Sequence, residues 1–247
     1  MKNLDRIPFF SIIIPAYNEE KLIKRCLTAV SNQKFPKDQY EVIVVDNAST
    51  DKTAELIKKF PVISLFESKK GLIPARNAGL KKAKGVYFIN LDADVEVPPD
   101  WLERIYTPLQ KNPRIALLTG PYKCVDDPQK FDLHNYIFSL ISSIANKILK
   151  TPLVYYGGNI VIKRQLFLDI GGYDLRYTTD QVSIINRLKK AGGEIYFDRK
   201  LQVLASPRRT KGRVLKFIFQ DIIVMYLFHN LYTKLTGKNL GNWEDIR

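Results

Sequence analysis

Three acidic residues follow an apolar run in the stretch FINLDADVEVP, residues 88–98. Asp92 and Asp94 are separated by one residue, and Glu96 comes two residues later. In extended backbone such side chains point the same way, so we expect both aspartates to face one site. Carboxylates suit hard cations such as Mg²⁺ or Mn²⁺, and a cation could lie between the aspartates and a diphosphate. The alternative is a solvated loop after a strand, because Asp-x-Asp is a common spacing.

Four short apolar runs separated by helical stretches must position these acids. The runs predict buried strands at 9–14, 41–45, 62–68 and 85–92. Between them, the spacing of apolar residues predicts helices over 19–33, over 51–60 and from near Pro74. Strand–helix alternation of this kind favours a mainly parallel sheet with helices on both faces.

A polar cluster follows three of these strands, at Pro15–Asn18, Asp46–Asp51 and Asp92–Asp94. Ligands of open α/β sheets bind beyond the carboxyl ends of the strands. We therefore expect the three clusters to meet at one edge of the sheet. Asn18 is a candidate cap for the first helix, and Thr50 or Asp51 for the second.

The second half of the chain is less regular. Helices are expected at 101–112, 131–150 and 178–193, and strands at 114–123, 194–198 and 201–206. Between 155 and 174, tight glycine turns alternate with a strand and a short helix.

The composition is basic, with 39 Lys and Arg against 25 Asp and Glu in 247 residues, a net charge of +14. Such an excess favours a polyanion as partner: nucleic acid, an anionic membrane face or phosphorylated substrates. The basic residues are scattered without an aromatic platform motif, so nucleic acid is not expected. The two cysteines, Cys26 and Cys124, predict neither a zinc site nor a disulfide framework, which favours a reducing compartment. Neither a signal peptide nor a membrane-spanning helix is expected.

Six sequence pieces, spread over residues 9–205, together resemble a family 2 glycosyltransferase with the GT-A fold. They are SIIIPAYNEE, VIVVDNASTDKT, GLIPARNAGLKKAKG, VYFINLDADVEVPPDWL, GGNIVIKRQLFLDIGGYD and TTDQVSIINRLKKAGG. The resemblance implies a Rossmann-like, mixed but mainly parallel sheet flanked by helices. It also implies a glycosyltransferase domain at 1–207, with a nucleotide-binding half at about 1–98 and an acceptor-binding half at about 99–207. A basic, amphipathic helical tail is expected at 208–247.

The resemblance also implies roles for individual residues. Asp46 would accept hydrogen bonds from the base, Arg76 would lie near the diphosphate, Asp92 would contact the ribose or a metal-bound water, and Asp94 would ligate Mn²⁺ or Mg²⁺. Asp180 would be the general base. The remaining positions are those lining the base and ribose pocket, namely Pro15, Ala16, Tyr17 and Glu19, and those near sugar and acceptor, namely Gly157, Gly158, Asn159 and Thr179.

The chain departs from the family pattern at two places. Thr179 stands where the family has Glu, and TTDQ can also be read as helix capping by Thr178 or Thr179. In place of a metal-binding histidine, the chain has the stretch VLASPRRTKG, in which Arg208 and Arg209 could bind diphosphate or form a solvated basic turn. The two histidines, His134 and His229, are expected to be packing residues.

Two implied ligands also have structural alternatives. Asp46 could cap the turn before the second helix. Arg76 could be an exposed helical residue paired with Glu67.

The expected function is inverting, metal-assisted sugar transfer from a UDP- or GDP-linked donor to a hydroxyl or lipid-linked acceptor, as in the synthesis of cell-envelope polysaccharide. Two alternatives remain: a non-catalytic, membrane-associated relative, and a polyprenyl-phosphate glycosyltransferase that needs no base because its acceptor is already ionised. A nucleotidyltransferase and a dehydrogenase are disfavoured, since neither type of glycine-rich loop follows the first strand.

The segment 211–235 combines aromatic and aliphatic residues with flanking lysines and arginines. Such a segment can lie in the interface of an anionic membrane, or it can pack on the domain or close a dimer. We expect a cytoplasmic protein bound peripherally to the inner face of the membrane. In liposome flotation, more of the whole chain than of a version ending near Arg209 should therefore float with the liposomes. Equal recovery of both in the soluble fraction would contradict membrane contact.

Overall fold

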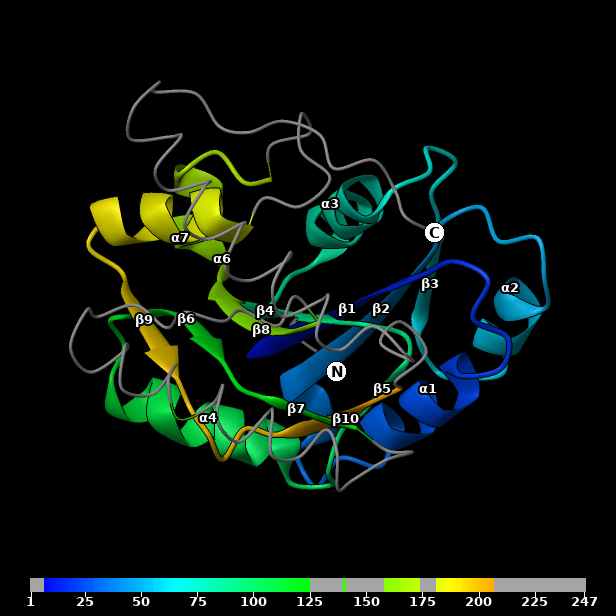
Figure 1. The fold of residues 1–247 in the computed structure, drawn as a ribbon, viewed down its shortest axis with the longest axis horizontal. Helices are drawn as coiled ribbons and strands as arrows, with labels where there is room; N and C mark the ends of the chain where they lie inside the picture. The colour runs from blue at the N-terminus through cyan, green and yellow to red at the C-terminus, as the bar shows by residue number, and fades with distance from the viewer. Residues whose placement is uncertain (1–6, 125–139, 141–157, 174–180, 207–247) are drawn as a thin grey trace, which may run out of the picture.

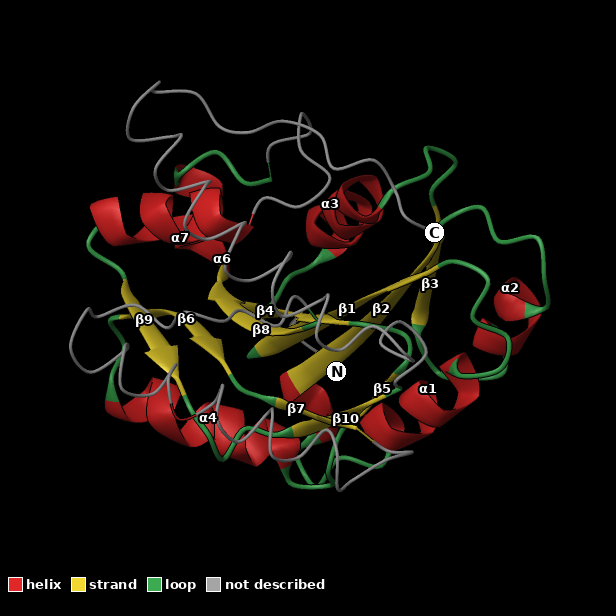
Figure 2. Cartoon of the chain, in the orientation of Figure 1, coloured by secondary structure: helices red, strands yellow, loops and turns green. Residues whose placement is uncertain are grey.

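A computed structural model describes residues 7–124, 140, 158–173 and 181–206 (Figures 1 and 2). The main sheet has seven strands in the order β3-β2-β1-β4-β8-β6-β9. The strands are β1 Phe10–Ala16, β2 Tyr40–Asp46, β3 Ile63–Phe66, β4 Tyr87–Leu91, β6 Ile115–Thr119, β8 Asn159–Lys163 and β9 Glu194–Phe197. All neighbours are parallel except β8, which is antiparallel to both β4 and β6. The expectation of a mixed but mainly parallel sheet is confirmed.

Helices cover both faces of this sheet. In Figure 1, α1 and α4 lie below the sheet, and α3, α6 and α7 lie above it. The helices are α1 Ile23–Ser31, α2 Thr53–Ile57, α3 Leu72–Lys82, α4 Trp101–Lys111, α6 Arg164–Asp169 and α7 Gln181–Lys190, with a 3₁₀ turn, η1, at Lys37–Gln39. A second sheet on the lower side joins β5 Val95–Glu96, β10 Val203–Ala205 and β7 Tyr122–Cys124.

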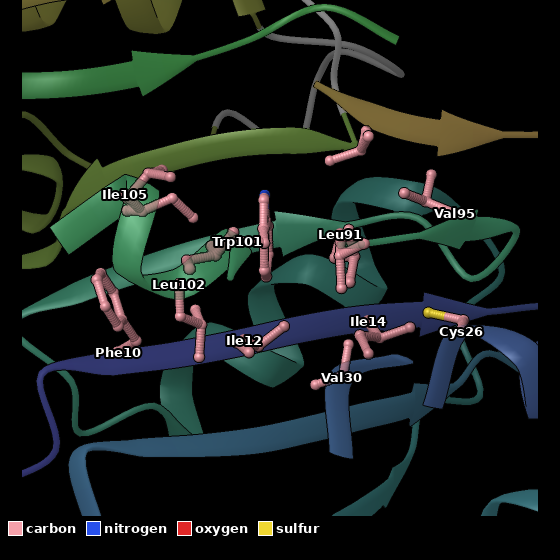
Figure 3. Packing of buried hydrophobic residues seen from close by; sticks show 14 of the residues in the cluster. Phe10, Ile12, Ile14, Cys26, Val30, Leu91, Val95, Trp101, Leu102 and Ile105 are labelled. Carbon is pink, nitrogen blue, oxygen red and sulfur yellow. The ribbon is translucent and has the colours of Figure 1, made fainter. Parts of the chain in front are cut away.

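Alternation along β1 supplies two cores. Ile12 and Ile14 pack on the lower side with Trp101 (Figure 3). Ile13 packs on the upper side with Phe167. A strand covered on both faces reads as one continuous apolar run, because successive side chains point to opposite faces. Burying each such isoleucine contributes roughly 1.5–3 kcal/mol, which fixes the strands that position the site.

Several boundaries differ from the sequence expectations. Helix α2 covers only Thr53–Ile57 of the expected 51–60, and α3 starts at Leu72, before Pro74. Asn18 does not cap α1, which starts at Ile23 without a side-chain cap. The reason is long-range: the Asn18 side chain accepts a hydrogen bond from the Thr50 amide at 2.8 Å instead.

Several expectations fall on residues outside the described part. They are the helix at 131–150, except Leu140, which is helical, and the tail at 208–247 with its segment 211–235. Within the described residues, no helix is both long and apolar enough to cross a bilayer.

Candidate active site

The carboxyl ends of β1, β2 and β4 open into one cleft. These strands are parallel neighbours with β1 in the middle, so the loops after them leave the same edge of the sheet. The cleft has a volume of about 310 Å³ and is lined by Pro15, Ala16, Tyr17, Asn18, Glu19, Asn47, Leu72, Ala75, Asp92, Ala93 and Asp94. The predicted convergence of three polar clusters is confirmed.

Hydrogen bonds between loops hold the β1 and β2 ends of the cleft together. The backbone amide of Glu19 donates to Thr53 Oγ1 at 2.7 Å, and that of Glu20 donates to Asp51 Oδ2 at 3.1 Å. Burial alone would raise the pKa of Asp51, but hydrogen bonds donated by Thr53 and Glu20 lower it below the ordinary value. Asn18 and Ala48 adopt positive φ angles of 53° and 57° in these loops, a conformation that costs a non-glycine residue free energy. The hydrogen bonds between the two loops therefore hold a strained backbone conformation in the wall of the cleft.

Asp92 and Asp94 lie on a turn, not on extended backbone as expected. The Asp92 carbonyl accepts a hydrogen bond from the Val95 amide at 3.1 Å, which closes the turn. Both residues still line the cleft, and Asp94 is 9% exposed. Glu96 lies beyond the turn on β5 and pairs with Arg25 at 3.2 Å, so the third acid of the stretch is outside the cleft.

Arg76 lies behind the aspartates. Its side chain is 3% exposed, and its Nη2 is 3.4 Å from Asp92 Oδ1. The alternative of an exposed arginine paired with Glu67 is wrong, because α3 starts early enough to turn Arg76 inward against the sheet. The Glu67 carboxylate instead accepts a hydrogen bond from the Lys69 amide at 2.8 Å. A buried cation thus stands beside the Asp92 carboxylate.

Two further ionisable side chains, Cys26 and Tyr122, lie near the aspartates and are uncharged. Burial, and then the charges of Asp94 and Asp92, raise the pKa of the Cys26 thiol, which donates to the Asp92 carbonyl at 3.7 Å. Burial, and then the charges of Asp92 and Asp94, also raise the pKa of Tyr122 well above its ordinary value. Both groups stay protonated near neutral pH, so neither adds negative charge beside the two aspartates.

Gly158 leaves room for Asp92. A Cβ atom at this position would lie 2.2 Å from Asp92 Cγ and 2.5 Å from Tyr122 Oη. Only glycine can stand there while the carboxylate keeps its place. The sequence assigned Gly158 to the sugar and acceptor region, and in the structure it contacts the predicted metal-binding region directly.

Asn159 serves the core. The residue has no exposed surface, its Nδ2 donates to the carbonyls of Gly120 at 3.3 Å and Leu201 at 2.9 Å, and its Oδ1 accepts from Trp101 Nε1 at 3.3 Å. This arrangement differs from the expected contact with sugar or acceptor, because these bonds engage its polar side-chain atoms inside the protein.

Asp46 is the last residue of β2, and Asn47 follows it at the β2 side of the cleft. Asp46 Oδ1 accepts a hydrogen bond from the Ser49 amide at 3.2 Å, as the turn-capping alternative requires. Asn47, which the sequence reasoning did not single out, lines the cleft and is 3% exposed. The only signal for it was its position directly after Asp46.

The remaining expected site residues are outside the described part of the chain: Gly157, Thr179, Asp180, Arg208 and Arg209. Helix α7 begins at Gln181, directly after the expected base in sequence. Among the described residues, no three His, Cys, Asp or Glu side chains form a cluster that could hold a metal by themselves. Two carboxylates with adjacent space fit a hard cation that takes its other ligands from a diphosphate and water.

A larger groove, of about 800 Å³, lies away from these carboxylates, between α1 and β10. Its single acidic residue is Glu96, which is already paired with Arg25. The larger groove therefore lacks two neighbouring carboxylates. The smaller cleft combines the polar groups expected of a nucleotide site and is the better candidate.

Comparison with known proteins finds related glycosyltransferases. The model of the family described as glycosyl transferase family 2 matches residues 11–171. A Methanococcus voltae protein named dolichyl N-acetyl-alpha-D-glucosaminyl phosphate 3-beta-D-2,3-diacetamido-2,3-dideoxy-beta-D-glucuronosyltransferase is 30% identical over 87% of this chain and 71% of its own length. Glycosyltransferase AglE of Haloferax volcanii is 41% identical over 40% of this chain and 34% of its own length.

Solved structures share the fold. Mannosyltransferase PcManGT from Pyrobaculum calidifontis, in complex with GDP-Man and Mn²⁺, superposes with a TM-score of 0.73 at 21% identity, over 94% of this chain and 66% of its own. TarS 1–349 of S. aureus in complex with UDP-GlcNAc gives a TM-score of 0.60 at 22% identity, over 80% of this chain and 58% of its own. The expected GT-A fold is confirmed, and the chain spans only part of these relatives. The chain belongs to glycosyl transferase family 2.

Proposed function

We propose that this protein is an inverting glycosyltransferase that moves a sugar from a UDP- or GDP-linked donor to a hydroxyl or lipid-linked acceptor. The observation that carries the proposal is the convergence of Asp92 and Asp94 with the β1 and β2 loops around one cleft, with buried Arg76 paired to Asp92. Structures with the same fold contain GDP-Man with Mn²⁺ or UDP-GlcNAc, which supports a nucleotide-sugar donor.

The sheet order supports one direction for the donor in the cleft. Carboxylates and guanidinium lie on the β4 side, so the diphosphate belongs there, and the nucleoside extends over β1 toward β2. Tyr17 and Glu19 would then line the nucleoside, with Asp46 at the base. Arg76, already held in place, neutralises charge as it builds on the leaving diphosphate without reorganising.

Asp94, with Asp92, would hold the divalent cation, Mn²⁺ or Mg²⁺. The bound cation would supply positive charge to the leaving diphosphate. Asp92 meanwhile keeps its orientation through Arg76 and through the space left by Gly158. Asp94 is the more buried of the two carboxylates.

Asp180 is proposed as the general base that takes the proton from an acceptor hydroxyl. Thr179 in place of the family's Glu favours a second possibility, in which the acceptor is an already ionised lipid phosphate and needs little help from a base. The Methanococcus voltae relative, whose name specifies a dolichyl-phosphate-linked sugar, supports a lipid-linked acceptor.

The test is donor hydrolysis and thermal stabilisation of the unaltered chain with a panel of nucleotide sugars, with and without Mn²⁺. We expect one UDP- or GDP-sugar to raise the melting temperature only with Mn²⁺, since a ligand that binds the folded state stabilises it by mass action. The same donor should be slowly hydrolysed. Binding without hydrolysis would favour a non-catalytic relative, and absence of any nucleotide binding would contradict the proposal.

A further inference from the structure

The loop from Glu67 to Gly71, between β3 and α3, is pinned to the end of β2 by one buried side chain. Asn47 Nδ2 donates to the carbonyls of Glu67 at 3.0 Å and Lys69 at 2.8 Å, and Asn47 Oδ1 accepts from the Gly71 amide at 2.8 Å. The Glu67 amide also donates to the Asp46 carbonyl at 2.9 Å. Gly71 has a φ of 134°, which lets the chain turn from this loop directly into α3.

This anchoring places one lysine at the cleft. Lys70 Nζ lies 3.2 Å from Tyr17 Oη and 5.0 Å from the centre of the Tyr17 ring, and Tyr17 lines the cleft beside Asn47. Within the described residues, no ion pair includes Lys70. An ammonium group has three N–H donors and no acceptor, so at least one donor remains for a ligand after the bond to Tyr17.

The position of Lys70 decides which part of a nucleotide it can meet. The aspartates lie on the β4 side of β1, whereas Asn47 and its loop lie on the β2 side. If the diphosphate lies at the aspartates, as proposed above, the base reaches the β2 side. Lys70 therefore faces the base and not the phosphates.

We propose that Lys70, positioned by Asn47, selects nucleobases that present an oxo group where others present an amino group. Uracil and cytosine differ in this way at position 4, and guanine and adenine at position 6. A donor-only ammonium group binds the oxo oxygen and leaves an amino group without a partner. Lys70 is thus a specificity-determining residue, and Asn47 a positioning residue. The inference rests on the proposed nucleotide-sugar donor.

The test measures affinities for UDP, CDP, GDP and ADP with Mn²⁺ by calorimetry. The wild-type protein should prefer UDP to CDP, or GDP to ADP, and Lys70→Ala should reduce that preference by about tenfold, because a hydrogen bond from a charged donor is lost. Lys69→Ala is the matched control, since it removes the same charge from the adjacent residue, whereas the Tyr17 contacts described above belong to Lys70. Asn47→Ala should reduce the preference as well, by releasing the loop.

The outcomes separate this inference from the proposal it rests on. If wild-type protein binds no nucleoside diphosphate with Mn²⁺, the proposed function fails and the inference falls with it. If nucleotides bind but Lys70→Ala and Lys69→Ala have the same preference as wild type, only the inference is overturned. Equal weakening of all four nucleotides by Lys70→Ala also overturns it, because that result would assign Lys70 to the phosphates.

Discussion

Replacing Asp94 with Asn should lower kcat for sugar transfer by about 10²- to 10³-fold, the cost typical of removing one electrostatic stabiliser of a transition state. The amide keeps the shape of the carboxylate but loses its charge, and Asp94 is one of only two acids on the turn that faces the cleft. Calorimetry of UDP and GDP with and without Mn²⁺ should show that the metal no longer strengthens nucleotide binding.

The matched control is Glu96→Gln, two residues further along the same stretch. Its carboxylate is paired with Arg25 outside the cleft, so this change removes an equal charge without touching the proposed metal region. A surface ion pair of this kind contributes little to stability, and we expect unchanged turnover. Metal-dependent binding that survives in Asp94→Asn would remove Asp94 from the proposed site.

The second large effect is expected from Gly158→Ala. The added Cβ would lie 2.2 Å from Asp92 Cγ, so the carboxylate must turn away from its position beside Arg76. Changes in the groups that orient metal ligands typically cost 10- to 100-fold in metal affinity or activity, and we expect a loss of about that size in metal-dependent nucleotide affinity.

Overlap alone can also destabilise a protein, so Gly79→Ala is the control. There the added Cβ would lie 2.4 Å from Ile13 Cγ2, inside the upper core and away from the carboxylates. Overpacking should lower the free energy of unfolding by about 1–3 kcal/mol, while the folded fraction keeps its nucleotide affinity. If Gly158→Ala lowers only the melting temperature, as we expect for Gly79→Ala, then Gly158 does not act through Asp92.

The central strands could be predicted from the sequence because helices cover both faces of the sheet. Ile12, Ile13 and Ile14 are all buried, so the middle of β1 reads as an apolar run, and the polar residues after the strand indicate the cleft. Parallel strands end at one edge of a sheet, which is why the meeting of the Pro15, Asp46 and Asp92 clusters could be inferred without coordinates.

Features set by distant partners could not be inferred in this way. The burial of Arg76 depends on where α3 starts, and that start depends on the bond between Asn47 and Gly71, 24 residues apart. Asn18 looked like a helix cap by local rules but bonds to Thr50, 32 residues away. The role of Gly158 beside Asp92 requires β8 to pair antiparallel with β4, which no local pattern of residues encodes.

That antiparallel pairing also restricts how the protein can open and close. Five residue pairs, from Tyr87 with Lys163 to Leu91 with Asn159, join β4 to β8 and so join the first half of the chain to the second. A hinge motion that separated the two halves would break this strand pairing in the middle of the sheet. An opening motion that preserves this pairing must therefore leave the centre of the sheet in place.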